Sequence, residues 1–298
     1  MVLHPQARRA IEATAGAPRV FEPDYDIGAA REAARSEAAA QPRESVAEVH
    51  DLDADGVPCR LYVPEDADPG LVLHLHGGGF VFHDVDVHDA ATRRLANRSG
   101  LPVLSVDYRR PPEHRFPAAP DDVDTVLAHL ADSGDFAGPW FAHGDSAGAN
   151  LALVAALRNP GRFRAVALIY PFLDPTASFA SYAEAADPAH DVGFDPREAA
   201  WYWQQYAARP ADLVDPDLAP LLSDRLATMP PTMIVTAEHD PLRDEGEQLA
   251  VLLADQGVAV VASRQLGQVH GFWRHPDVFD AAEPVMRSVA GFLRQHCP

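Results

Sequence analysis

The sequence predicts an α/β fold with a mostly parallel sheet flanked by helices. The first observation is a set of short apolar segments, typical of strands buried on both faces, at residues 71–76, 102–107, 139–143, 164–169 and 232–236. The second is a set of helix-forming segments between or after them, at residues 87–99, 120–131, 147–158 and 243–256. Strands that alternate with helices indicate βαβ units, in which helices cover both faces of a parallel sheet.

The segments before and after this alternating stretch extend the predicted fold. Residues 1–45 are rich in Ala, Glu and Arg with helical spacing, which predicts two helices. Residues 46–52 and 57–63 flank an Asp-Ala-Asp-Gly turn, so we expect them to form an antiparallel pair. Residues 258–263 predict one more strand at the edge of the sheet, and residues 277–296 predict a closing helix.

One connection is too long to be a loop of a compact domain. About sixty residues separate the predicted strands at 164–169 and 232–236, and they are rich in Pro, Asp and aromatic residues. We therefore expect residues 171–230 to form a helical insertion, a cap that lies over the ends of the strands.

Composition and charge narrow the class of protein. The 298 residues suffice for one large domain or two modest ones, and 47% of them are hydrophobic, as in a chain with a sizeable core. The net charge of −20 argues against nucleic acid or an anionic membrane surface as a partner. Cys59 and Cys297 form no visible disulfide framework, and residues 1–15 lack the apolar region of a signal peptide. No segment approaches the ~18 consecutive apolar residues of a membrane span, so we expect a soluble cytoplasmic protein.

A serine lies at the sharpest predicted turn. The apolar residues 140–142 are followed closely by the pattern Gly144-Asp145-Ser146-Ala147-Gly148, and a helix-forming segment comes directly after it. Glycine two residues to either side lets the chain reverse tightly around a strained serine, and the start of the helix directs free N–H groups toward the site. The pattern is typical of a nucleophile elbow, although a serine N-cap between loop glycines would give the same five residues.

Three consecutive glycines end the first parallel strand, in His76-Gly77-Gly78-Gly79-Phe80. Backbone without side chains can approach a substrate carbonyl and donate N–H groups to it. We therefore predict an oxyanion hole made by the amides of Gly77, Gly78 and Ala147. His76 is expected to order this loop rather than to act as a base.

The acid that orients a catalytic histidine is expected just after a later strand. Asp240 follows the predicted strand at 232–236, at the edge where ligand sites form in open α/β sheets. Glu238 remains an alternative because spacing alone does not separate the two carboxylates. Asp244 falls on the following helix, where a surface or capping role is expected.

The base is expected last in the chain. His270 lies after the predicted strand at 258–263 and is followed by glycine. His275 and His239 are weaker alternatives, since a single histidine in a loop is more often a solvated side chain.

Taken together, these segments resemble the bacterial esterase branch of the hormone-sensitive-lipase family of α/β-hydrolases. The order Ser146, Asp240, His270 is that of an α/β-hydrolase triad. The resemblance covers roughly residues 45–296 and includes the structural signature that begins at Asp107-Tyr108-Arg109. It implies an eight-stranded α/β-hydrolase fold and a serine carboxylesterase that hydrolyses small-molecule esters without a cofactor or metal.

The resemblance also divides the chain. Residues 46–170 and 231–298 would form the catalytic core, and residues 1–45 would join the insertion at 171–230 in a helical cap. Two dipeptides depart from the family pattern: Phe82-His83 stands where a small residue and glycine are usual, and Arg110-Pro111 replaces Leu-Ala. We expect the first to narrow the surroundings of the oxyanion loop, and both to bear on the range of substrates.

Aromatic side chains are expected to line the substrate pocket. The candidates are Phe80, Phe82, Trp201, Tyr202 and Phe272, with Trp203 and Tyr206 as further possibilities. The alternative for about half of them is that they pack the cap onto the sheet. A cap over the site favours short or medium acyl chains.

Other functions and partners stay open at this stage. A metal enzyme is disfavoured, because the spacing within the group His74, His76, His83, Asp84, Asp86, His88 and Asp89 fits no common zinc site. A ligand-binding protein on the same fold would typically lack the nucleophile or the base. A thioester, lactone or amide as substrate is not separated from an ester by sequence. The edge strand at 258–263 could pair with a second copy in a homodimer.

Overall fold

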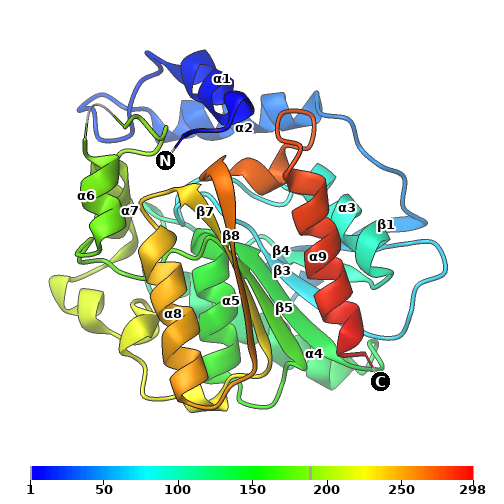
Figure 1. Ribbon diagram of the computed structural model, residues 1–298. Helices are drawn as coiled ribbons and strands as arrows, with labels where there is room; N and C mark the ends of the chain where they lie inside the picture. Colours follow the sequence, from blue (N-terminus) through cyan, green and yellow to red (C-terminus); the bar gives the residue numbers. More distant parts are fainter. Residues whose placement is uncertain (1, 188–189, 298) are drawn as a thin grey trace.

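A single eight-stranded sheet organises the protein, with helices on both of its faces (Figure 1). The computed structural model describes residues 2–187 and 190–297, so the predictions for the first and last residues and for 188–189 of the insertion lie outside the described residues. The strands are β1 (Glu48–Ala54), β2 (Val57–Val63), β3 (Leu71–Leu75), β4 (Val103–Val106), β5 (Trp140–Asp145), β6 (Ala165–Ile169), β7 (Thr232–His239) and β8 (Val260–Val269).

The helices follow the predicted alternation closely. The α-helices are α1 (Pro5–Thr14), α2 (Ile27–Ala39), α3 (Asp89–Ser99), α4 (Ala118–Ser133), α5 (Ala147–Arg158), α6 (Ala180–Ala185), α7 (Pro196–Tyr206), α8 (Arg243–Asp255) and α9 (Ala282–Gln295). Short 3₁₀ helices are η1 (Pro210–Val214), η2 (Pro220–Leu222), η3 (Leu226–Thr228) and η4 (Phe272–Arg274).

The strand order is β1-β2-β4-β3-β5-β6-β7-β8. Strand β2 pairs antiparallel with β1 and β4, and all pairs from β4 to β8 are parallel. The prediction of a mostly parallel eight-stranded sheet is therefore confirmed. Because the strands of the parallel part run in one direction, their carboxyl ends meet at one edge of the sheet.

The central strands are buried along their whole length because helices cover both faces. In β3, Leu71, Leu73 and Leu75 belong to a core with α4, α5 and α8, whereas Val72 belongs to a second core with α3 and α9. Alternate side chains of one strand thus enter opposite layers. This explains why the sequence shows continuous apolar segments there rather than alternation.

Strand β8 is longer than the sequence indicated, and α9 begins later. The predicted strand at 258–263 continues to Val269, and the continuation was missed because one face of this edge strand is exposed and carries polar residues. Gly267 lies within the continuation and donates its N–H to the Glu238 carboxylate at 2.7 Å. The longer strand brings residue 270 directly to the carboxyl edge of the sheet.

The N-terminal helices and the long insertion lie beyond that edge. Figure 1 shows α1 and α2 beyond the ends of β7 and β8, with α6 and α7 beside them. The His4 N–H donates to the Gly267 carbonyl at 2.9 Å, and the Arg31 guanidinium donates to the Val81 carbonyl at 2.9 Å. In the part of the chain that the structure describes, no helix has the length and apolar character needed to cross a bilayer.

Candidate active site

Ser146 occupies the tight turn between β5 and α5. Its backbone has φ 54° and ψ −121°, a conformation that a non-glycine residue adopts only when the surroundings enforce it. A Cβ atom on Gly148 would lie 2.0 Å from the Leu75 carbonyl oxygen, and one on Gly144 would lie 2.2 Å from the Gly148 carbonyl oxygen. Gly148 is therefore required for the turn to pack against β3, and Gly144 is required for β5 to approach the start of α5.

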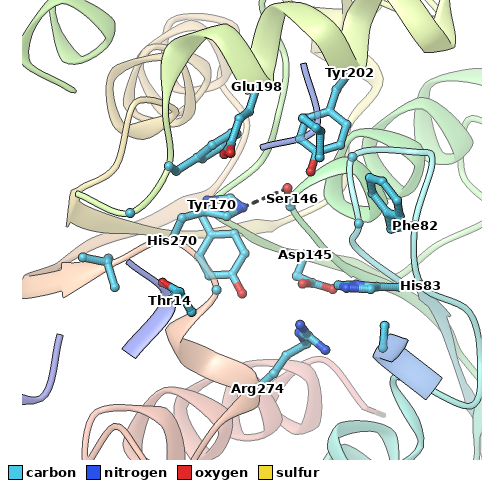
Figure 2. A pocket seen from close by; sticks show the side chains of 18 of the residues that line it. Thr14, Phe82, His83, Asp145, Ser146, Tyr170, Glu198, Tyr202, His270 and Arg274 are labelled. Carbon is cyan, nitrogen blue, oxygen red and sulfur yellow. Dashed lines mark hydrogen bonds between the residues drawn. The ribbon is translucent and has the colours of Figure 1, made fainter. Parts of the chain in front are cut away.

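The serine, a histidine and an aspartate form a hydrogen-bonded chain at the carboxyl edge. His270, directly after β8, has its Nε2 atom 3.0 Å from the Ser146 hydroxyl oxygen, and Figure 2 shows this contact. Its Nδ1 atom lies 2.7 Å from Oδ2 of Asp240, which follows β7 and is buried. With Nδ1–H donated to the carboxylate, Nε2 is free to accept the serine proton.

The surroundings hold this chain in place. Asp240 accepts the Leu242 N–H at 2.9 Å through its other oxygen, so both carboxylate oxygens are engaged. The His270 ring contacts the rings of Tyr170 and Phe194, with centroid distances of 4.4 and 4.9 Å. Hydrogen bonds at both nitrogens and two aromatic contacts thus hold the orientation of the imidazole.

The alternative acids lie elsewhere. Glu238 accepts the N–H of Gly267, and Asp244 accepts the Ser181 N–H at 2.8 Å as well as a bond from Arg243. Neither of these two carboxylates forms a hydrogen bond with His270.

The alternative bases do not reach the serine. His239 lies 3.6 Å from Glu238. His275 lines the same cavity as Ser146, but burial, reinforced by the nearby Arg274 charge, lowers its pKa to about 3. Of the candidate histidines, only His270 contacts both the hydroxyl and a carboxylate.

The structure of the glycine loop differs from the prediction at one of the expected oxyanion donors, Gly77. The N–H of Gly77 donates to Asp145 Oδ1 at 2.9 Å, so this amide is not free for a substrate and its prediction as an oxyanion donor was wrong. Among the described residues, the N–H groups of Gly78, Gly79 and Ala147 donate to no protein acceptor. Gly78 and Gly79 have φ values of 121° and 60°, and both line the cavity beside Ser146.

Glycine is required at both loop positions for steric reasons as well. A Cβ atom on Gly79 would lie 2.2 Å from the Tyr202 ring, and one on Gly78 would lie 2.3 Å from the Phe82 carbonyl oxygen. His76 Nδ1 lies 2.9 Å from the Gly77 carbonyl oxygen, and the Tyr108 hydroxyl donates to the His76 carbonyl at 2.7 Å. His76 therefore holds the glycine loop in place, as expected from the sequence, rather than acting as a base.

A group of buried histidines lies beneath the serine. His74 Nδ1 is 3.0 Å from His143 Nδ1, and His74 Nε2 is 3.3 Å from His88 Nδ1. Ligand-capable atoms of His74, His88 and Asp145 lie within 4.8 Å of one another, a grouping that the spacing of the histidines alone did not reveal. Burial lowers the pKa of His74 to about 3 and that of His88 well below its usual value. Because both nitrogens of His74 already contact other imidazoles, a cation here would have to displace the bond to His88.

A cavity of about 530 Å³ opens beside Ser146. Its walls come from α1, α2, the glycine loop, the insertion and the segment after β8. The lining residues include Ala10, Ile11, Thr14, Tyr25, Phe82, His83, Tyr170, Phe194, Glu198, Tyr202, Arg274 and Phe279. The volume is that of a small-molecule site.

Only two of the five aromatic residues predicted first for the pocket line this cavity. Phe82 and Tyr202 do, whereas Phe80, Trp201 and Phe272 do not, which corrects their prediction. Phe80 is fully buried and stacks on Tyr206 with 3.8 Å between ring centroids.

The other two misplaced aromatics pack behind the wall. Trp201 stacks on the outer side of Phe82, and Phe272 is buried against Tyr170 and Phe279. Sequence reasoning missed Phe194 and the α1 residues, because no motif marks them and only the packing of remote segments brings them to the serine.

The two departures from the family pattern contact each other. The Arg110 guanidinium donates to the His83 carbonyl and also pairs with Asp107 at 3.1 Å. Arg110 therefore supports the turn that places Phe82 and His83 on the cavity wall.

The comparisons with known proteins agree with this geometry. Residues 72–274 match the family described as the α/β hydrolase fold. An ethyl acetate hydrolase of Pseudomonas putida is 34% identical over 259 residues, covering 82% of this chain and 80% of the relative, and an arylesterase of Saccharolobus solfataricus is 32% identical over 254 residues, covering 80% and 81%. The solved structure of a hyperthermophilic esterase from the archaeon Pyrobaculum calidifontis has a TM-score of 0.88 at 36% identity and covers 99% of both chains. The chain therefore belongs to the esterases of the α/β-hydrolase fold family and is a carboxylic ester hydrolase.

Proposed function

We propose that Ser146, His270 and Asp240 are the catalytic triad of this esterase. The observation that carries the proposal is the continuous hydrogen-bonded chain from the Ser146 hydroxyl through His270 to the buried Asp240, at 3.0 and 2.7 Å. An isolated serine hydroxyl is a weak nucleophile, and an adjacent base oriented by a carboxylate is what activates it.

In the proposed mechanism, His270 takes the proton of Ser146 as the hydroxyl attacks the ester carbonyl carbon. The negative charge that develops on the carbonyl oxygen is stabilised by the amides of Gly78, Gly79 and Ala147. His270 then protonates the leaving alcohol, and water repeats the sequence to release the acid from the acyl-enzyme. Loss of one oxyanion donor is expected to lower kcat by about 10²- to 10³-fold.

We also propose that the chain has a helical cap and belongs to a particular branch of the family. Residues 1–45 and 171–230 act as one cap over a core of residues 46–170 and 231–298, and the chain belongs to the bacterial branch of the hormone-sensitive-lipase family. The support is that α1, α2 and the insertion all contribute to the cavity wall. The cavity of about 530 Å³ and the ethyl acetate named for the Pseudomonas putida relative favour esters with short to medium chains.

A homodimer through the β8 edge is proposed as the assembly. Strand β8 ends the sheet, and Val261 and Leu266 on it are 50% and 71% exposed. An unpaired strand edge with apolar side chains is a surface that a second copy can cover. Sedimentation of the wild type as a monomer at micromolar concentration would contradict this assembly.

A chain-length series of nitrophenyl esters tests the catalytic proposal. Wild-type protein should turn over the short and medium esters, and Ser146→Ala should lose at least about 10⁴-fold in kcat, since the nucleophile itself is removed. A fluorophosphonate probe should label the wild type and leave Ser146→Ala unlabelled. Dialysis against a chelator should leave turnover unchanged. Turnover that survives in Ser146→Ala would reject the mechanism.

A further inference from the structure

The cavity contains a cation that the proposed chemistry does not use. Arg274 ends η4, four residues after His270, and its half-buried side chain lines the cavity. Among the described residues, no carboxylate lies within ion-pair distance of its guanidinium and no acceptor takes a hydrogen bond from it. Arginine carries its charge at every relevant pH and presents several N–H groups in one plane, a geometry that matches a carboxylate.

Two uncharged polar groups without partners lie on the same wall. The Nδ1 atom of His83 is buried, lines the cavity and has no hydrogen-bond partner. The Tyr170 hydroxyl is also buried there and forms no hydrogen bond of normal geometry, although burial and the neighbouring Asp145 carboxylate raise its pKa. Figure 2 shows the Tyr170 hydroxyl and the Arg274 guanidinium pointing into the same part of the cavity, with His83 and Asp145 beside it. Buried polar groups are seldom left without partners, so an acceptor supplied by a ligand would satisfy them.

Two acidic side chains, Glu198 and Asp145, line the cavity together with Arg274. Glu198, on the wall formed by the insertion, pairs with Arg19 at 3.2 Å. Asp145 accepts the Gly77 amide; burial raises the pKa of its carboxyl, and the nearby Arg274 charge opposes this rise. The field of the whole chain, with its net charge of −20, repels anions in general. Arg274, which forms no ion pair among the described residues and lines the same cavity as Ser146, is therefore the local feature that would let an anionic substrate enter.

We propose that Arg274, with Tyr170 and His83, selects esters that carry a carboxylate on one of their two halves, such as half-esters of dicarboxylic acids or acetates of hydroxy acids. The inference rests on the triad proposed above, because the anion would be held while Ser146 attacks the ester carbonyl. Arg274 acts on specificity: it binds a part of the substrate that does not react.

Matched pairs of esters test this assignment. On the acyl side, monomethyl adipate is compared with methyl hexanoate; on the alcohol side, 4-acetoxybutanoate is compared with butyl acetate. For each pair, kcat/KM is measured by pH-stat titration for wild type, Arg274→Gln and Arg274→Lys. The ratio of the charged to the neutral ester is the readout, since a purely structural role of Arg274 would lower both members equally.

In at least one pair, Arg274→Gln should lower this ratio by about 10- to 100-fold, the usual effect of losing a charge-assisted hydrogen bond. Arg274→Lys should retain part of it, because the charge remains without the planar fork. Arg287→Gln, which removes an exposed arginine from α9, is the matched control and should leave the ratio unchanged.

The two proposals fail in different ways. Hydrolysis of the neutral esters that persists in Ser146→Ala would overturn the proposed function. Hydrolysis that depends on Ser146, with charged-to-neutral ratios unaffected by Arg274→Gln in both pairs, would overturn the anion site alone. A ratio that falls equally in Arg287→Gln would assign the effect to net charge and would also reject the role of Arg274.

Discussion

The floor and the wall of the active site are built in different ways. On the floor, Ser146, Asp240 and His270 each follow directly after a strand of the sheet, and hydrogen bonds of 2.7 and 3.0 Å connect them. The wall is assembled from α1, α2, the insertion and the segment after β8. The sheet thus fixes the reacting groups, whereas packing between remote segments shapes the space around them. We therefore expect changes on the floor to alter kcat, and changes on the wall to alter KM and substrate range.

The largest expected loss of kcat on the floor follows from a change of the Asp240 carboxylate, and it tests whether the floor controls kcat. Asp240→Asn should lower kcat by about 10⁴-fold, because an amide favours the wrong tautomer of His270. Glu238→Gln is the matched control: its side chain contacts Gly267 instead of His270 and should change kcat little. Steady-state kinetics on a nitrophenyl ester measures both. A larger loss in Glu238→Gln than in Asp240→Asn would identify Glu238 as the acid.

A smaller loss of kcat is expected from changes at Asp145, which connects the floor to the glycine loop. Asp145→Ala removes the acceptor of the Gly77 N–H, so the loop should shift and kcat should fall by about 10²-fold, as small misplacements near the chemistry do. Asp145→Asn keeps an acceptor oxygen and should lose less. If both variants retain wild-type kcat, the contact with Gly77 does not position the loop.

Changes on the cavity wall should alter which acyl-chain lengths the enzyme prefers. Tyr202→Ala removes a ring that covers Gly79, and it should raise kcat/KM for longer acyl chains relative to acetate by about tenfold, since each added methylene in an apolar pocket contributes about 1–3 kcal/mol. Trp201→Ala is the control, because that neighbouring side chain does not line the cavity. Equal chain-length profiles for wild type and Tyr202→Ala would show that this part of the wall does not set the range.

The smallest expected effect is a change in the pH dependence of the unfolding free energy, caused by the buried histidines near Asp145. Burial and the neighbouring His74 hold the pKa of His143 well below 6.5, so its contribution to stability is complete above pH 6.5 and is lost as the pH falls. His143→Gln should therefore reduce the slope of the unfolding free energy against pH, below about pH 6.5, by about 1.4 kcal/mol per pH unit. Urea unfolding at several pH values measures the slope, with the exposed His50→Gln as control. Equal slopes for wild type and His143→Gln would exclude the effect.

The sequence predicted the floor better than the wall for a physical reason. The turn at Ser146 depends on glycines that lie two residues away, and the positions of Asp240 and His270 depend on the ends of nearby strands. Such relations are local, so a pattern records them. Gly77 was misassigned because the direction of its amide depends on Asp145, which belongs to a neighbouring strand.

The errors on the wall have the same origin. Phe80, Trp201 and Phe272 are aromatic and lie near the correct motifs, but their ring packing directs them into the core or behind Phe82. No local pattern distinguishes an aromatic ring that faces the cavity from one that faces the opposite way. The same holds for Arg274, because only the packing of the described residues shows that its guanidinium forms no ion pair with any of them.

Helix α1 has a practical consequence for handling the protein. Ala10, Ile11 and Thr14 belong to the cavity wall, and the backbone of His4 is hydrogen-bonded to β8. An affinity tag fused ahead of Pro5 would continue from a helix that forms part of the cavity wall, whereas one fused after α9 would emerge at the opposite end of the sheet (Figure 1). Kinetic constants measured on two differently tagged preparations of this esterase can therefore disagree without any change in the catalytic residues.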